Sequence, residues 1–286
     1  MSDTTDPTDI DWAARADAEL VAELTNGVLW LTINRAESGN AIPFYVRDRL
    51  IKHFRDAHVD LAARCIVLTA TGEKHFCTGA DLSIRPPAPG GRVEGAPERV
   101  VGSATDMMRR GFQTLMQVIQ DCEKPVIVAL NGTAAGGGAM LTLAADLVIA
   151  AEHAKLISVF VRRGLVPDGG VAYLLPRIVG MHKAKELVFF GDDLSAADME
   201  RLGIANKVVP MPDLHATTKE WAERLAQGPT KQIGWSKKLL QDATEIGRRA
   251  LLEEEAMIVE LNSGTHDGME GMNSYREKRP VRFTGW

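Results

Sequence analysis

The sequence has few of the residues that build disulfide frameworks, metal centres or membrane spans. Only three of its 286 residues are cysteines, Cys65, Cys77 and Cys122. This odd number without paired spacing argues against a disulfide framework and against a zinc site. No apolar run approaches the roughly 20 residues that a transmembrane helix needs. We therefore expect no metal and no membrane span, and small core positions for Cys65 and Cys77, which lie in apolar runs.

The chain also lacks an excess of positive charge. Its 38 acidic and 33 basic residues give a formal net charge of -5, which does not favour nucleic acid as a partner. Hydrophobic residues make up 45% of the chain, as is typical of globular proteins. The first 18 residues are rich in Asp and Thr and lack the charged and apolar segments of a signal peptide. We expect a disordered leader over residues 1–18 and a cytoplasmic location.

Hydrophobic patterning predicts an α/β core over residues 19–210 and a helical C-terminal region over residues 211–286. Strands and helices alternate between residues 64 and 150, which favours parallel strands. The Pro- and Gly-rich segment 85–95 predicts a mobile surface loop. Asn26-Gly27 is typical of a tight hairpin turn. The expected elements are strands at 20–24, 28–33, 65–69, 126–130, 147–150 and 205–209, and helices at 43–59 and 103–121.

Two glycine-containing turns are candidates for a binding site. Gly136, Gly137 and Gly138 follow a predicted strand and open a short helix of small residues. Glycine lets the backbone approach a ligand closely, and N–H groups at a helix start lack partners and favour negative charge. The run matches neither a dinucleotide fingerprint nor a Walker loop, so a tight crossing of two segments is the alternative. A second turn follows a strand end at residues 76–82. Two such turns can each direct one N–H at a single oxygen, which is the geometry of an oxyanion hole.

These segments together resemble the crotonase superfamily of enoyl-CoA hydratases and isomerases. Phe76-Cys77-Thr78-Gly79-Ala80-Asp81-Leu82 is similar to the family motif FxxGADL. The stretch from Lys124 through Asn131-Gly132 to the glycine run is similar to the second family motif. Further landmarks match in order over roughly residues 20–283. They are Asn34-Arg35, Asn40-Ala41, the segment 203–209 and the tail Glu277-Lys278-Arg279.

The resemblance implies a crotonase-like spiral of ββα units with a helical C-terminal trimerisation region, and a homotrimer or hexamer. It implies an acyl-CoA thioester substrate, whose coenzyme A is part of the substrate, and no separate cofactor. The N–H groups of Ala80 and Gly137 would hold the enolate oxygen. Asp81 and Leu82 would line the CoA site with Ala80. Lys278 would reach the CoA of a neighbouring subunit, or else remain a solvated surface charge.

The sequence departs from the hydratases of this family at two positions. Those enzymes carry two glutamates that hold and activate water, and the matching residues here are Met140 and Phe160. Neither side chain can transfer a proton, although both can line the acyl pocket. The usual hydration mechanism is therefore not expected.

Asp168, eight residues after Phe160, is the candidate replacement. It resembles the single acid of some isomerases of the family, and one carboxylate suffices for a 1,3-proton shift. An apolar setting with Met140 and Phe160 would raise its pKa, whereas pairing with Arg162 or Arg163 would lower it. Because Pro-Asp-Gly also suits turns and helix caps, a turn or N-cap role is the alternative.

Three functions remain open at this point. The first is an enoyl-CoA isomerase with Asp168 as the base. The second is an enoyl-CoA hydratase, or another acyl-CoA lyase or hydrolase, with acids recruited from elsewhere in the chain. The third is an acyl-CoA-binding protein that has lost the chemistry. The sequence does not specify the acyl group.

Overall fold

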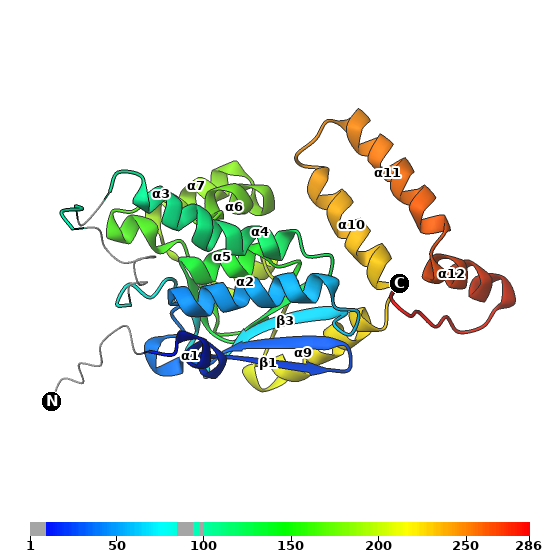
Figure 1. Ribbon diagram of the computed structural model, residues 1–286, viewed down its shortest axis with the longest axis horizontal. Coiled ribbons are helices and arrows are strands. Elements are labelled where there is room, and N and C mark those ends of the chain that lie inside the picture. The colour runs from blue at the N-terminus through cyan, green and yellow to red at the C-terminus, as the bar shows by residue number, and fades with distance from the viewer. Residues whose placement is uncertain (1–9, 85–93, 98–99) are drawn as a thin grey trace.

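The computed structural model describes residues 10–84, 94–97 and 100–286, and the chain there forms two sheets with helices around them (Figure 1). In spatial order the larger sheet contains β1 (Leu20–Thr25), β2 (Val28–Ile33), β3 (Cys65–Ala70), β5 (Val126–Leu130), β7 (Leu147–Ala151) and β10 (Lys207–Val209). Only β1 and β2 pair antiparallel, and the other neighbours are parallel. The predicted α/β class is confirmed.

The strands of this sheet lie where local sequence signals are strong. Asn26 and Gly27 have φ angles of 53° and 78°, the left-handed conformation that a two-residue hairpin requires. All five residues of β5 are buried, which explains its uninterrupted apolar sequence. The strand predicted at 205–209 starts two residues later, because the Asn206 side chain instead accepts the N–H of Val148 at 2.8 Å.

A smaller sheet of short strands was not predicted. It contains β4 (His75–Cys77), β6 (Thr133–Ala135), β8 (Lys155–Ile157) and β9 (Asp193–Ser195), in that order. The first three are parallel, and each follows a strand of the larger sheet. A strand, a short second strand and a helical segment thus recur along the chain, as the predicted spiral of ββα units requires. Three-residue strands carry too little alternation to be recognised from sequence.

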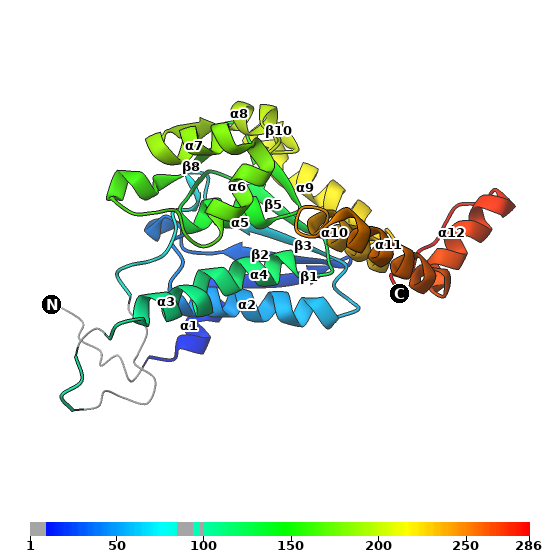
Figure 2. The same ribbon diagram turned by 90° about the horizontal axis from the view of Figure 1, so that it is seen from above.

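Helices cover both faces of the larger sheet. The helices of the core are α2 (Phe44–Val59), α5 (Gly137–Ala144), α6 (Val171–Val179), α7 (Met181–Phe190), α8 (Ala196–Arg201) and α9 (Met211–Ala226), with short helical turns η1 (Ala36–Ser38) and η3 (Val159–Arg163). Figure 2 shows α2 on one side of the sheet and α9 on the other. Because α9 packs against β2, β3, β5 and β7, it belongs to the core, although the prediction placed it in the C-terminal region.

The last three helices leave the core. They are α10 (Thr230–Asp242), α11 (Arg248–Ser263) and α12 (His266–Glu277), and they extend to one end of the molecule (Figure 1). Lys237 of α10 forms an ion pair with Asp146 of the core, with Nζ 2.9 Å from Oδ2. No residue of α11 is buried. The C-terminal region is therefore helical as predicted, and much of its surface is uncovered in a single chain.

The second half of the predicted disordered leader is corrected by the structure. Helix α1 (Trp12–Glu19) begins after Asp11, whose carboxylate accepts two N–H groups of the first turn. The Trp12 ring lies 5.1 Å from the Phe44 ring, edge-on, and 5.0 Å from the Tyr45 ring. The composition suggested disorder because these aromatic partners lie about 30 residues away on α2. The leader residues 1–9 lie outside the described residues.

The helix predicted at 103–121 is interrupted. The structure has α3 (Ser103–Met108), a π-helical turn η2 (Arg109–Gln113) and α4 (Thr114–Gln120). Within η2, Gly111 has φ -100° and ψ -110°, which is not helical. Most of the predicted 85–95 loop lies outside the described residues.

Two glycine-containing turns cross at the end of β4 and the start of α5. A Cβ atom added to Gly138 would lie 2.1 Å from the carbonyl oxygen of Cys77. A Cβ atom on Gly79, whose φ is 110°, would lie 3.3 Å from the nitrogen of Gly137. The predicted tight crossing therefore exists, and it needs glycine because backbone atoms occupy the space of a side chain.

We expect Gly138→Ala to lower the free energy of unfolding by about 3 kcal/mol or more, because its methyl group would overlap the Cys77 carbonyl. The higher helix propensity of alanine returns only about 1 kcal/mol. Urea unfolding measures the difference. Gly264→Ala is the control, since its added Cβ would have its nearest neighbour at 3.6 Å. Equal effects of the two substitutions would contradict the crossing.

Candidate active site

The N–H of Ala80 faces away from the strand segment beside it. Ile42 donates its N–H to the Gly79 carbonyl at 2.8 Å, and Asp81 donates its N–H to the Ile42 carbonyl at 2.9 Å. In this parallel bridge the N–H of Ala80 itself points to the other side, where no backbone acceptor of the described residues meets it. Ala80 is exposed, so this donor is accessible to a ligand.

The N–H of Gly137 is the second accessible donor. Gly137 is the first residue of α5, and an N–H in the first turn of a helix has no intrahelical acceptor. The glycine crossing brings this nitrogen next to Gly79, and so next to the peptide that carries the Ala80 N–H. The helix dipole adds partial positive charge at this end of α5. The pair of donors is suited to a small anionic oxygen.

Asn40 fixes the segment that precedes these donors. It has a left-handed φ of 52° and is buried. Its Nδ2 donates to the carbonyls of Thr71 at 2.9 Å and His75 at 2.7 Å, and its Oδ1 accepts the Arg35 N–H at 2.9 Å. The predicted landmark Asn34-Arg35 with Asn40-Ala41 therefore has a structural role, which is to hold the segment before α2 against the connection between β3 and β4.

Asp168 lies in the turn between η3 and α6. Its carbonyl accepts the Val171 N–H at 3.1 Å, but the cap position of α6 is Gly170 and no side chain caps that helix. Among the described residues, none donates a hydrogen bond to the Asp168 carboxylate. Burial raises the pKa of Asp168 above that of an exposed aspartate. A partly buried carboxylate without partners is suited to accept a proton.

Phe112 and Met140 lie between this turn and the glycine run. A Cβ on Gly169 would lie 3.5 Å from Phe112 Cβ and 3.6 Å from Met140 Cγ. A Cβ on Gly137 would lie 2.7 Å from Phe112 Cε1. The structure therefore brings together the Gly137 donor, the turn of Asp168 and two apolar side chains, one of which was predicted.

Sequence reasoning missed Phe112. It belongs to η2, where the broken helix turns at Gly111, and the expectation of a continuous helix gave no reason to single it out. The one available signal was Gly111 itself, an interior glycine that lowers helix propensity. A Cβ on Gly111 would lie 2.7 Å from Arg47 Nη1, so the glycine also admits a side chain from α2.

The remaining side chains near Asp168 leave its charge uncompensated. Arg162 Nη2 lies 2.8 Å from Asp193 Oδ1 and therefore pairs elsewhere, and Arg163 is exposed. Phe160 is buried in η3. The alternative in which either arginine pairs with Asp168 and lowers its pKa is not observed among the described residues.

Three predicted CoA-binding residues have different surroundings. Asp81 forms an ion pair with Arg35, Nη2 to Oδ2 2.9 Å, while Leu82 is 82% exposed. Lys278 is exposed at the end of α12, far from α5 of the same chain (Figure 1). The structure does not bring Lys278 to the site of its own chain.

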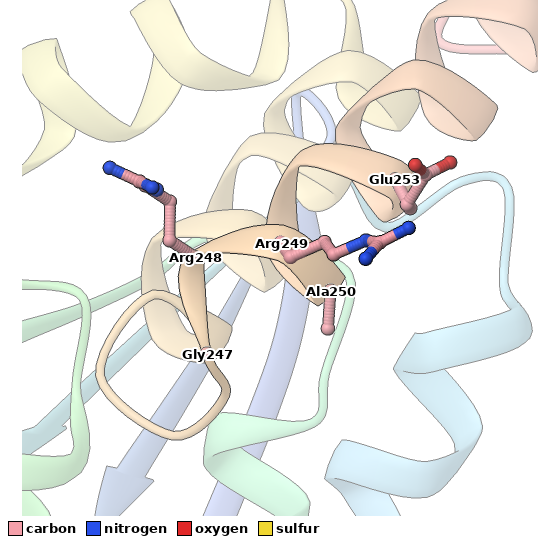
Figure 3. Close-up of a pocket in the computed structure, with 5 residues that line it drawn as sticks. All are labelled: Gly247, Arg248, Arg249, Ala250 and Glu253. Atoms are coloured by element: carbon pink, nitrogen blue, oxygen red, sulfur yellow. The ribbon is translucent and has the colours of Figure 1, made fainter.

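Other cavities lie away from these residues. An open surface pocket of about 700 Å³ at the start of α11 is lined by Gly247, Arg248, Arg249, Ala250 and Glu253 (Figure 3). A pocket of about 270 Å³ includes Asp146, Tyr173 and Arg177. In the described part of the chain, no group of three or more metal-ligating side chains is found, and no helix is long and apolar enough to cross a membrane.

Comparison with known proteins gives consistent matches over nearly the whole chain. The family model described as enoyl-CoA hydratase/isomerase matches residues 23–285. The chain is 35% identical to a probable enoyl-CoA hydratase of Rhodobacter capsulatus, over 92% of this chain and 96% of that protein. It is 34% identical to 1,2-epoxyphenylacetyl-CoA isomerase of Escherichia coli, over 93% and 98%. A crystal structure of enoyl-CoA hydratase from Bacillus anthracis matches with TM-score 0.83 and 30% identity, over 94% and 100%.

Asp168→Asn is expected to raise the melting temperature at about pH 7. Because the pKa of Asp168 is raised in the folded state, the folded protein binds this proton more tightly than the unfolded chain, and ionisation costs stability. The gain from Asn should disappear below the unfolded pKa of about 3.9, where the carboxyl is protonated in both states. Thermal unfolding measured between about pH 3 and 8 tests this.

Asp193→Asn is the matched control with the opposite sign. Hydrogen bonds from Arg162 and Lys155 lower the pKa of Asp193, so its stabilisation is present at neutral pH and is lost as the pH falls. This substitution should lower the melting temperature at neutral pH. A lower melting temperature for Asp168→Asn as well would mean that the Asp168 carboxylate has a stabilising partner.

Proposed function

This chain belongs to the enoyl-CoA hydratase/isomerase family, and we propose that within it the protein is an enoyl-CoA isomerase with Asp168 as its base. The proposal rests on one observation. A partly buried carboxylate without described partners lies in a turn that contacts Met140 and Phe112, and the Phe112 ring also lies against Gly137.

In the proposed reaction the thioester oxygen accepts hydrogen bonds from the N–H groups of Ala80 and Gly137. Asp168 removes a proton from C2 of a 3-enoyl-CoA, and the electron pair delocalises over the thioester as a dienolate. The same carboxyl group then returns the proton to C4, which leaves the double bond between C2 and C3. Each oxyanion donor of this kind typically contributes about 3–4 kcal/mol of transition-state stabilisation. No separate cofactor is needed, because the thioester itself acidifies C2.

The residues at the two glutamate positions disfavour hydration. Met140 is fully buried and Phe160 is 5% exposed, and neither can activate water. The names of the relatives include both reactions, since a crotonyl-CoA hydratase of Syntrophomonas wolfei is 31% identical, while the Escherichia coli relative is an isomerase. Hydration with non-standard acids and binding without catalysis are the alternatives that the following experiment separates.

Asp168→Asn should reduce the conversion of 3-enoyl-CoA to 2-enoyl-CoA by about 10²-fold or more, the usual contribution of a general base. The dissociation constant for the acyl-CoA should stay within about threefold, because Asn is nearly isosteric. The absorbance of the conjugated thioester measures turnover for several chain lengths, and calorimetry measures binding.

Asp193→Asn is again the control, since it removes a carboxylate that pairs with Arg162 outside the site. It should keep wild-type turnover. Unchanged turnover in Asp168→Asn would exclude the base. Formation of a 3-hydroxyacyl-CoA by the wild type would establish hydration, and binding without turnover would favour the non-catalytic alternative.

We also propose that the C-terminal helices bind further copies of this chain, as a homotrimer or hexamer. Helix α11 has no buried residue, yet both α11 and α12 expose large apolar side chains. Patches of this kind mark interaction sites. The exposed side chains are Leu252, Met257, Val259, Leu261, Met269, Met272 and Tyr275.

The double substitution Met257→Glu and Leu261→Glu should shift the protein towards monomers, because burying two carboxylates in an apolar interface is unfavourable. Light scattering coupled to gel filtration measures the mass. Glu255→Gln, on the same helix, is the control and should leave the mass unchanged. An unchanged mass in the double variant would exclude α11 from the interface.

A further inference from the structure

Partly buried charges connect helix α1 with the turn that carries Ala80. Arg35 Nε lies 2.6 Å from Glu19 Oε2, and Arg35 Nη2 lies 2.9 Å from Asp81 Oδ2. The three side chains are 6%, 18% and 11% exposed in the order Arg35, Glu19, Asp81. Arg35 Nη1 also donates to the Ala41 carbonyl. Removing one member leaves an uncompensated buried charge, so the three side chains act as a unit.

Asp81 connects the ion pairs of Arg35 to the peptide group that carries the Ala80 N–H. The N–H of Asp81 donates to the Ile42 carbonyl, and its carboxylate is held by Arg35. On the other side of Ala80, the Gly79 carbonyl accepts the Ile42 N–H. The direction of the Ala80 N–H is therefore set by bonds on both sides, and Arg35 supplies the side-chain part of them.

Glu19 connects this unit to the N-terminal helix. Its Oε2 accepts the Tyr45 hydroxyl at 2.8 Å, and its Oε1 accepts Arg15 Nε at 2.9 Å. Helix α1 precedes residue 23, where the family match begins. A segment upstream of the matched region thus contacts, through one arginine, the turn of a proposed oxyanion donor.

We propose that Glu19 and Arg35 are positioning residues that hold Asp81 and thereby direct the Ala80 N–H at the thioester oxygen. This inference rests on the proposed function, because it needs Ala80 to be an oxyanion donor. Small displacements of such a donor weaken transition-state stabilisation more than substrate binding, since the bond is stronger to the enolate than to the ground-state carbonyl. The signature is a loss in kcat rather than a rise in KM.

The experiment compares Arg35→Met, Arg35→Lys and Glu19→Gln with the wild type. Arg35→Met should lower kcat by about 10- to 100-fold, less than the ~10²–10³-fold for deleting a donor, with KM within about threefold. Arg35→Lys keeps the charge and should lose less. The absorbance of bound cinnamoyl-CoA gives a second readout that needs no turnover. The oxyanion donors polarise this conjugated thioester and shift its band to longer wavelength, and the shift should shrink in the order of the kcat losses.

Asp146→Asn is the matched control, because it breaks another buried ion pair, with Lys237, away from these donors. It should leave kcat and the shift of the absorbance band at wild-type values. If Arg35→Met and Glu19→Gln also leave kcat and the band shift at wild-type values, the positioning role is wrong. If Arg35→Met does not fold, Glu19→Gln and Arg35→Lys decide in the same way. A wild-type protein that shifts the band without isomerising 3-enoyl-CoA refutes the isomerase alone. A wild type that shifts no band refutes the Ala80 donor and this inference together.

Discussion

The close crossing at Gly79 and Gly138 is the contact on which the rest of the site depends. The Cys77 carbonyl occupies the place that any side chain at 138 would need, so the end of β4 lies directly against the first turn of α5. This contact joins two ββα units that are more than 50 residues apart. It also brings the N–H of Gly137 next to the peptide that carries the Ala80 N–H. Fold and site are thus consequences of the same backbone approach, which only glycine permits.

Local signals in the sequence were sufficient for much of the fold. The bounds of β2 agree with the prediction, because an Asn-Gly turn fixes its start. The family structures confirm the predicted crotonase-like class. Helix α1 and the break at Gly111 were missed for a common reason. Both depend on distant partners, Phe44 for Trp12 and Arg47 for Gly111, and such contacts leave no periodic trace in the segment itself.

The residues of the candidate site likewise include some that the sequence predicted and some that it did not. The glycine run was predicted from residue type and spacing, and Asp168 from its resemblance to the single acid of some isomerases of the family. Phe112 and Glu19 were not, because each acquires its proposed importance from what it touches. Phe112 contacts the glycine run and the Asp168 turn, and Glu19 contacts Arg35 from the end of a helix that was not predicted. The role of a side chain that acts through a neighbour can be predicted only when that neighbour is known.

The features of the site are costly for a folded protein, and this cost argues for function over structure. A partly buried carboxylate without a described partner lowers stability, because burial disfavours its charged form. The pairs outside the site have the opposite character, since Asp193 holds Arg162 and Lys155, and Asp146 holds Lys237 and accepts the Val126 N–H. Asp193 and Asp146 thus form ion pairs, whereas no described residue pairs with Asp168. The N–H groups of Ala80 and Gly137 and the Asp168 carboxylate have no described partners. A substrate with one anionic oxygen and one acidic C–H would supply a partner to each of them.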